Sequence, residues 1–319
     1  MAEAHEDDDI FVYMGGDQVV PLNVRRVKID KSVKIITSQA FEHRRRLIYV
    51  EFHDGIEIIG KWAFHGCISL KSLVKLLGVK VIEIGAFNDC SGASEVEFGD
   101  KLESIGKCAF QDCTSLRTIK MPSVRSIGNW AFSSCVRLID LDLPEALETV
   151  EEFAFHNCQR LGRISMPLKD GMIEDVVFTF CPKLATVYLV GGIHNTVASL
   201  HLERWRNEMK REINRINQVL PTTDSAENEN TEAIQQWIRS VIRQIGHYKT
   251  QHKELLKDAT TILELALWKA KMNEKEEDSL GEVKAKKIKL DMQSERSERR
   301  ITSGANIVIK NVLPYLELK

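Results

Sequence analysis

The sequence predicts an α+β protein in which a right-handed solenoid of seven coils is followed by a long α-helical hairpin. Two periodicities predict this fold. A unit of 23 residues recurs through the first half of the chain, and apolar side chains recur every seven residues in the second half. A period of about 20 to 50 residues is typical of solenoids, because stacked units share a core that no single unit can form. A sustained heptad pattern is typical of packed helices.

The 23-residue unit is clearest in four copies, which read IGKWAFHGC from Ile59, IGKCAFQDC from Ile105, IGNWAFSSC from Ile127 and VEEFAFHNC from Val150. Weaker copies extend the series to seven phenylalanines, at steps of 23, 23, 23, 22, 23 and 23 residues: Phe41, Phe64, Phe87, Phe110, Phe132, Phe155 and Phe178. Six cysteines stand three residues after a phenylalanine: Cys67, Cys90, Cys113, Cys135, Cys158 and Cys181. Because neighbouring coils should lie about 4.8 Å apart, we expect each series to form a structural ladder inside the solenoid.

After the cysteine, the unit alternates between apolar and polar residues, as in Leu116, Ile119 and Met121, and Pro122 closes the segment. This alternation predicts a half-buried strand. The outward positions of successive strands then form a row of exposed residues: Glu51, Glu97, Lys120, Asp142, Ser165 and Tyr188. Mixed charge favours a specific protein over a polyanion. We therefore expect this row to bind a protein, whose identity the sequence does not give.

Several copies depart from the pattern. Arg44 takes the place of the cysteine in the first copy, which predicts a polar terminal cap. In the second copy Lys75 stands where an apolar residue is expected, which predicts a one-residue bulge. The third copy has Gly85 and Ala93 in place of a large aromatic residue and a leucine, so we expect it to be the loosest coil. Cys108 occupies the position of that aromatic residue in the fourth copy, which predicts another core residue.

The I-G-x-x-A-F-x-x-C-x-x-L-x-x-I-x-x-P pattern resembles the BspA-like class of leucine-rich repeats over about Val33 to Val190. This resemblance implies a right-handed solenoid that binds other proteins. Together with the segments WRNEMKREINRINQVLP, WIRSVIRQIGHYK and IVIKNVLPYLEL, the repeats are also similar to an uncharacterised group of diatom proteins with a C-terminal helical region. That resemblance implies an architecture and no activity.

The second half of the chain carries a heptad seam whose members are spaced alternately four and three residues apart: Ile234, Ile238, Val241, Ile245, Tyr248, His252, Leu255, Ala259, Ile262 and Ala266. A preceding amphipathic segment, from about Thr196 to Leu220, ends at Pro221. A short polar connector joins the two segments, so we expect an antiparallel helical hairpin. As an alternative to the solenoid, such a hairpin would provide the function of the protein by mediating homo-oligomerisation or incorporation into a larger assembly.

These patterns divide the chain into five segments. Residues 1–32 form an acidic N-terminus and a capping hairpin around Gly15 and Gly16, and residues 33–192 form the solenoid. Residues 193–272 form the helical hairpin, residues 273–300 a charged linker, and residues 301–319 a docking segment that Pro314 keeps from being one long helix.

Composition bounds the partners and the compartment. The net charge of −2 provides no field that would attract nucleic acid or anionic lipid, and no apolar run is long enough to span a membrane. The first nine residues are acidic, unlike a secretory signal. We expect an intracellular, cytoplasmic protein that binds neither nucleic acid nor membrane. The basic string Lys284–Lys289 resembles a nuclear import signal, with solvated charge as the alternative.

No pattern indicates catalysis. The periodic cysteines lack CxxC spacing and a histidine in register, so buried reduced thiols are favoured over a metal array. His65 and His156 recur in the Ala-Phe-His turn, either as ligands or as solvated turn residues. No phosphate-binding glycine loop, zinc-ligand cluster or serine nucleophile motif is found in the sequence. We expect no cofactor, no metal and no catalytic residue, and an enzyme or a nucleic-acid binder is the alternative from another class.

Overall fold

The computed structural model describes residues 10–71, 73–200, 202–220 and 229–280. The chain divides into two compact units, Met1–Ser199 with Asn207–Ile242, and Leu200–Arg206 with Arg243–Lys319. The first unit contains the solenoid and the start of the helical region. Among the described residues, no helix combines the length and the apolar character needed to cross a membrane.

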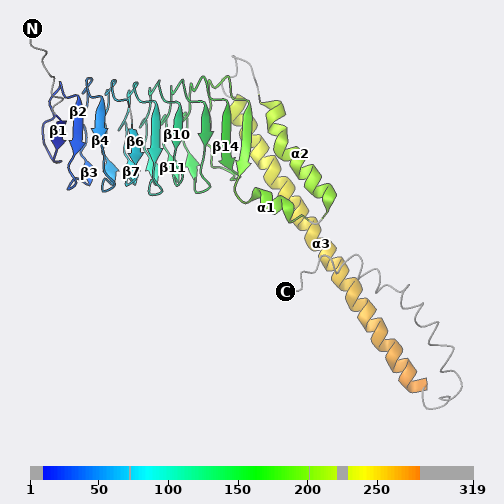
Figure 1. Cartoon of the computed structure of the whole chain (residues 1–319). Helices are drawn as coiled ribbons and strands as arrows, with labels where there is room; N and C mark the ends of the chain where they lie inside the picture. Colours follow the sequence, from blue (N-terminus) through cyan, green and yellow to red (C-terminus); the bar gives the residue numbers. More distant parts are fainter. Residues whose placement is uncertain (1–9, 72, 201, 221–228, 281–319) are drawn as a thin grey trace, which may run out of the picture. The chain divides into compact units, whose positions relative to one another are not determined.

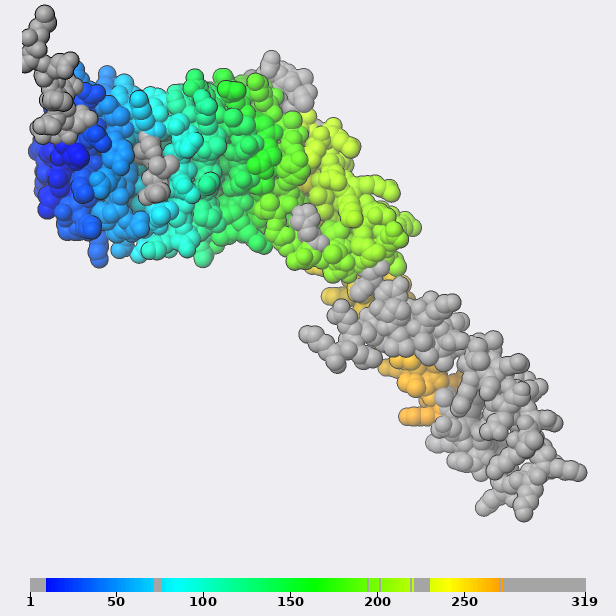
Figure 2. All heavy atoms as spheres, in the orientation of Figure 1, coloured from blue at the N-terminus to red at the C-terminus, as the bar shows by residue number. Residues whose placement is uncertain are grey.

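Two rows of parallel strands run along the solenoid (Figure 1). The coils are stacked in chain order, as the gradual change of colour along the molecule shows (Figure 2). The row of longer strands comprises β1 (Ile10–Tyr13), β2 (Arg26–Ile29), β4 (Tyr49–Glu51), β6 (Leu73–Leu76), β8 (Glu95–Phe98), β10 (Thr118–Lys120), β12 (Asp140–Asp142), β14 (Arg163–Pro167) and β15 (Thr186–Val190). The row of two-residue strands comprises β3 (Ile35–Ile36), β5 (Ile58–Ile59), β7 (Val81–Ile82), β9 (Ser104–Ile105), β11 (Ser126–Ile127) and β13 (Thr149–Val150). The predicted fold, a solenoid of about seven turns followed by helices, is confirmed.

Strand pairing confirms one sequence prediction and corrects another. The register between β6 and β8 shifts between Leu73 and Leu76, where the bulge at Lys75 was predicted. The capping hairpin predicted around Gly15 and Gly16 is wrong, because β1 pairs with β2 in parallel. A hairpin would make the two strands antiparallel. The chain instead makes a short additional coil there, with Ile10 opposite Arg26.

The seven phenylalanines stack in one column inside the solenoid. Their ring centroids are separated by 4.7 to 5.8 Å, and successive rings are inclined by 1° to 16°. Each ring is almost completely buried. Tyr13 extends the column beyond Phe41 with a centroid distance of 4.9 Å, and its hydroxyl lies 2.9 Å from the hydroxyl of Thr37. Burial of each ring contributes roughly 1.5 to 3 kcal/mol before conformational entropy is subtracted.

The turn that carries each phenylalanine has left-handed backbone on both sides of it. The residue two positions before the ring has positive φ in every coil: Gln39, Trp62, Gly85, Cys108, Trp130, Phe153 and Val176. The residue two positions after it does too: His43, Gly66, Asp89, Asp112, Ser134, Asn157 and Phe180. Backbone hydrogen bonds to the next coil hold this geometry, as in Phe41 N to Ala63 O at 2.7 Å. These bonds offset the conformational cost of the left-handed residues.

One prediction about this turn is corrected. Cys108 is half-exposed at its left-handed position and is therefore not a core residue. At Gly85, in the coil that was predicted to be the loosest, the indole of Trp62 in the previous coil occupies the space that a side chain would fill. A Cβ atom added to Gly85 would lie 2.2 Å from Cε3 of Trp62.

The six periodic cysteines form a second buried column beside the rings. Each thiol donates to the backbone carbonyl of the phenylalanine one coil earlier, with sulfur–oxygen distances of 3.1 to 3.4 Å. In the first coil Arg44 stands at the cysteine position, and its guanidinium donates to the carbonyls of Val20 and Glu42 at 2.6 Å. Arg44 therefore satisfies carbonyl groups at the start of the stack, as a polar cap should.

Helical residues cap the other end of the stack. The helices are α1 (Ile193–Ala198), α2 (Glu203–Val219) and α3 (Glu229–Leu280). The amide of Phe178 donates to Oγ1 of Thr231 at 2.9 Å, and the side-chain amide of Asn230 donates to Cys181 O at 3.1 Å. On the outer edge of β15, the amide of Val187 donates to Oδ1 of Asn217 at 2.8 Å. These side chains replace the backbone partners that a further coil would supply.

Within the first unit, α2 and α3 are joined by a hydrogen bond from the indole of Trp237 to the carbonyl of Glu212, at 2.9 Å. Trp237 is completely buried. In the second unit, Trp205 stacks on Tyr248 with a centroid distance of 5.1 Å. The heptad seam is buried as far as Tyr248, whereas Leu255 is exposed.

The helix α3 extends to Leu280 and so includes the beginning of the segment predicted as a charged linker. The rest of that segment, the Lys284–Lys289 string and the docking segment 301–319 lie outside the described residues.

Candidate protein-binding face

The strands of the longer row bring the predicted binding residues into register. Glu97 lies opposite Lys120 on β8 and β10, and Asp142, Ser165 and Tyr188 lie opposite one another on β12, β14 and β15. At the start of the solenoid, Glu51 lies opposite Lys28 on β2. These residues alternate with buried apolar residues, because successive side chains of a strand point to opposite faces.

The exposure of these residues is uneven. Glu51, Lys120, Asp142 and Tyr188 are exposed, and Glu97 is half-buried. Ser165 differs from the sequence expectation, since only 7% of its surface is accessible. This short side chain lies between its longer neighbours on the adjacent strands, and its hydroxyl donates to Oδ1 of Asp142 at 2.6 Å. Ser165 therefore orients Asp142 and presents little surface of its own.

The charged residues of the row form ion pairs with residues on neighbouring strands. Lys28 contacts Glu51 at 3.0 Å, and Lys120 contacts Glu97 at 3.5 Å. The guanidinium of Arg163 lies 3.1 Å from the carboxylate of Asp142. Exposed ion pairs of this kind contribute only about 0 to 1 kcal/mol to stability. Their main effect is to fix an alternating pattern of charge on the surface.

A second row of outward residues lies beside the first and was missed in the sequence. Its members are found two residues earlier on each strand: Arg26, Tyr49, Glu95, Thr118, Asp140, Arg163 and Thr186. The guanidinium of Arg26 lies over the ring of Tyr49, 5.6 Å from its centroid, and Arg163 contacts Asp140 at 3.3 Å. The same period-two alternation that indicated the first row would have indicated this one.

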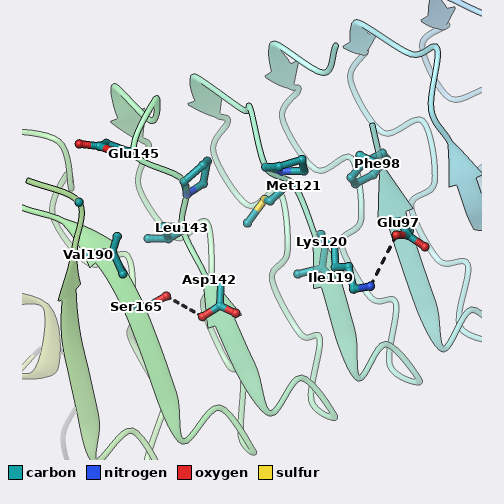
Figure 3. Close-up of a pocket in the computed structure, with 13 residues that line it drawn as sticks. Glu97, Phe98, Ile119, Lys120, Met121, Asp142, Leu143, Glu145, Ser165 and Val190 are labelled. Carbon is teal, nitrogen blue, oxygen red and sulfur yellow. Dashed lines mark hydrogen bonds and ion pairs between the residues drawn. The ribbon is translucent and has the colours of Figure 1, made fainter. Parts of the chain in front are cut away.

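A groove of about 510 Å³ lies at the carboxyl ends of the central strands of this face (Figure 3). Its apolar lining consists mainly of the buried residues Phe98, Met121 and Leu143 together with Pro122 and Pro144. Three carboxylates and one ammonium group line its margin: Glu97, Asp142, Glu145 and Lys120. The groove thus combines an apolar interior with a net acidic rim.

The groove coincides with an interruption in the longer row of strands. Among the described residues, the ladders join β6, β8 and β10 into one sheet and β12, β14 and β15 into another, with no ladder between β10 and β12. The connection between the two strands of a coil is also shorter here. Residues 121–125 link β10 to β11, whereas residues 143–148 link β12 to β13. This difference of one residue accounts for the single 22-residue step in the phenylalanine series.

This face carries no group arrangement typical of catalysis among the described residues. It combines paired charges, two exposed tyrosines and a shallow apolar groove, which are features of protein interfaces. The periodic thiols take no part in it, because they are buried. Burial raises the pKa of Cys67 and Cys113 to about 12 and holds the pKa of Cys90, Cys135 and Cys158 well above the ordinary value.

Comparison with known proteins supports the repeat assignment. The family model described as "BspA type Leucine rich repeat region" matches six copies, over residues 21–105 and 80–199. A leucine-rich repeat protein of T. pallidum is 30% identical, with 48% of this chain and 72% of that chain covered and a TM-score of 0.43. No curated protein matches the chain.

Two further solved structures are similar to about half of the chain. A leucine-rich repeat protein from Bacteroides ovatus is 25% identical, with 52% of this chain and 55% of that chain covered and a TM-score of 0.39. One from Eubacterium ventriosum is 26% identical, with 47% and 41% covered and a TM-score of 0.44. The chain therefore spans about half the length of these two proteins or less. The family model matches more than half of this chain, and the chain belongs to the BspA-type leucine-rich repeat family.

Proposed function

We propose that this protein is a non-catalytic scaffold that binds a protein partner on the strand face of its solenoid. The observation that supports this most directly is the row of outward side chains in register on paired parallel strands, from Glu97 and Lys120 to Asp142 and Tyr188. Rigid strands hold such side chains at fixed spacing, so a partner meets a preorganised surface. Preorganisation reduces the entropy lost on binding.

The groove suggests the chemistry of the partner. Its apolar lining, which includes Pro122 and Pro144, suits an apolar side chain, and the excess of carboxylates at its margin suits a neighbouring lysine or arginine. We therefore propose a protein segment that presents an apolar anchor next to a basic residue. The basic side chains Lys28, Lys120 and Arg163 on these strands are each paired with a carboxylate, which disfavours a polyanion.

Affinity capture with matched variants tests the face. One variant carries alanine at Glu97, Lys120, Asp142 and Tyr188. Its control carries alanine at four exposed residues outside the strand rows: Lys107, Arg137, Glu152 and Phe180. We expect the first variant to lose partners that the wild type and the control both retain, while all three unfold at similar denaturant concentrations. Retention of every partner by the strand-face variant would refute the proposal.

A second candidate function is self-association through α3. Several large apolar side chains in the second unit are 51% to 63% exposed: Leu255, Ile262, Leu265, Leu267 and Trp268. Leu255 and Ile262 are one heptad apart on the seam, which is the spacing that pairs two helices of the same kind. We propose a second copy of the chain as the occupant of this surface.

Sedimentation at tens of micromolar tests self-association. We expect a dimer that dissociates when Leu255 and Ile262 are both replaced by aspartate, and that persists when aspartate replaces Thr260, an exposed residue of the same helix. A monodisperse monomer of the wild-type chain would remove this candidate and leave the strand-face proposal untouched.

A further inference from the structure

We propose that the turns of the first two complete coils form a binding site for a divalent transition-metal ion such as Zn²⁺, with Glu42, His43 and His65 as ligands. One ring nitrogen of each histidine and one carboxylate oxygen of Glu42 lie within 4.8 Å of one another. Across the described part of the chain, no other three histidine, cysteine or acidic side chains bring their donor atoms this close. The inference does not depend on the strand face.

The repeat brings these residues together. Glu42 and His65 each follow the ladder phenylalanine of their coil, so they are neighbours in the stack, and His43 occupies the left-handed position next to Glu42. The amide of His43 donates to the carbonyl of His65 at 2.7 Å, which fixes the two backbones relative to each other. The imidazole rings face each other at a centroid distance of 4.8 Å and an angle of 59°.

A glycine makes room for one of these rings. Gly66 follows His65 in the second coil, and a Cβ atom on it would lie 2.5 Å from Nδ1 of His43. The equivalent position carries a side chain in later coils, as at Asp89 and Asp112. The imidazole of His43 therefore lies against bare backbone and close to His65.

Outer hydrogen bonds orient the ligands. Nδ1 of His65 lies 3.2 Å from the carbonyl oxygen of Asn88, an arrangement that places the proton on Nδ1 and leaves the lone pair on Nε2. Metal-binding histidines commonly make such a bond with the nitrogen that does not bind the metal. One carboxylate oxygen of Glu42 accepts from the side-chain amide of Gln39 at 2.9 Å, which leaves its other oxygen available.

The donor set determines the class of ion. Two imidazole nitrogens and one carboxylate suit Zn²⁺ or a similar transition metal, whereas Mg²⁺ and Ca²⁺ favour oxygen ligands. Ligands about 2.0 to 2.1 Å from tetrahedral zinc lie about 3.3 Å apart. Small side-chain rotations would bring the three donor atoms to that separation, because His43 is exposed and the other two residues are half-buried. A fourth position would be open to water.

Calorimetric titration of the full chain with Zn²⁺ alone, with Mg²⁺ as the comparison ion, tests this site. We expect one Zn²⁺ per chain and no response to Mg²⁺. His43→Gln and His65→Asn should each weaken Zn²⁺ binding at least about tenfold, and Glu42→Gln should weaken it less. The matched control is His156→Asn, which changes the histidine at the equivalent turn position of a later coil. Nδ1 of His156 lies 3.4 Å from the Ser133 hydroxyl, with no second histidine in that pair of turns.

A second measurement on the wild-type chain tests the site even if the histidine variants fail to fold. In the wild-type chain, Zn²⁺ should shift the ring-proton NMR signals of His43 and His65 and leave those of His156 unchanged. Absence of Zn²⁺ binding would overturn the proposal. Binding that shifts neither of the two signals, or that survives both histidine substitutions, would overturn it equally.

Discussion

A thiol is well suited to the buried position that recurs in each coil. The cysteine side chain is small and largely apolar, so its burial costs little, yet its S–H group can still donate a weak hydrogen bond. Here it donates to the phenylalanine carbonyl of the previous coil, as Cys90 does to Phe64 at 3.2 Å. The same carbonyl also accepts from a backbone amide of its own coil, as Phe64 O does from Cys67 N at 3.2 Å, so the thiol adds a link between successive coils. The period of the cysteines follows from this geometry and requires no redox or metal chemistry.

Thiol reactivity should separate Cys108 from the other six cysteines. Cys108 is half-exposed, and its pKa is raised by partial burial, whereas the ladder thiols are buried. We expect iodoacetamide to modify one thiol per native chain, slowly at pH 8 and faster as the pH rises, because the thiolate is the reactive form. Mass spectrometry of the modified peptides identifies the site. Cys108→Ser should abolish the native reaction, and modification of any ladder cysteine at a comparable rate would contradict this account.

Gly85 provides a residue-scale test of the turn geometry. Gly85→Ala places a side chain on left-handed backbone, which costs roughly 1 to 2 kcal/mol, and drives its Cβ against Trp62. We expect a clear drop in the denaturant midpoint. Replacing Trp62 by alanine in the same chain should recover part of the loss from Gly85→Ala, measured against Trp62→Ala alone, because it removes the steric clash and leaves the backbone cost.

Gly162→Ala is the matched control for Gly85→Ala. Gly162 is not among the left-handed glycines, and the nearest atom to an added Cβ would be 3.8 Å away. We expect this substitution to be nearly neutral. Equal effects of the two substitutions would show that φ and the Trp62 contact do not decide the cost at Gly85.

At the scale of elements, the periodic parts of the chain could be predicted and the singular parts could not. The repeat predicts the phenylalanine column, the cysteine column and the strands. The bulge near Lys75 could be predicted because it is a departure from that repeat. The first strand pair was mistaken for a hairpin because alternation is the same in parallel and antiparallel strands. Ile10 and Arg26 are also only 16 residues apart, so this coil falls outside the 23-residue period.

The binding face was predicted in outline, and its details depend on neighbours in space. Alternation placed Ser165 on the outer side of its strand, but it could not show that Asp142 and Tyr188 flank a shorter side chain there. The groove coincides with a connection that is one residue shorter than its neighbour. The Glu42, His43 and His65 cluster was not predicted. His43 stands two residues after the ladder phenylalanine of its coil, and no other coil has a histidine at that position. A comparison of each turn with the next, position by position, would have found it.

The cap formed by α3 depends on specific polar side chains. Thr231 is buried, and its hydroxyl oxygen accepts from the amide of Phe178. Thr231→Val keeps the size of the side chain but leaves that buried amide without its partner, so we expect a loss of about 1 to 3 kcal/mol in unfolding free energy. Amide hydrogen exchange at Phe178 should accelerate in parallel. The control is Thr196→Val, which removes an exposed hydroxyl that bonds to Gly192 O and should change stability little.

If Thr231→Val proved neutral while hydrogen exchange at Phe178 stayed slow, the helix would not be capping the stack through this bond. Neutral stability with faster exchange would restrict its effect to the local opening of the last turn. The two measurements therefore separate a global role of the cap from a local one.

At the scale of the whole molecule, a stack of coils needs a closed end. The last strand of an uncapped solenoid presents unpaired backbone groups that can pair with another chain. Here the amide of Val187 on β15 is satisfied by Asn217, and residues 207–242 belong to the same compact unit as the coils. Gln235 adds contacts of 3.0 and 3.2 Å to the carbonyls of Ile173 and Glu174. The start of the helical region is therefore structurally part of the solenoid domain.

Two truncated chains distinguish this view from one in which the helices are a separate appendage. A chain that ends at Ser199 keeps every coil but loses Asn217 and Thr231, whereas a chain that ends at Lys249 retains both. We expect the shorter chain to unfold at a lower urea concentration and to associate at its exposed β15 edge, because terminal repeats need a polar cap. The longer chain should match the full protein in urea midpoint. Urea titration and light scattering measure both properties, and a monomeric shorter chain with an unchanged midpoint would mean that the coils close their own end.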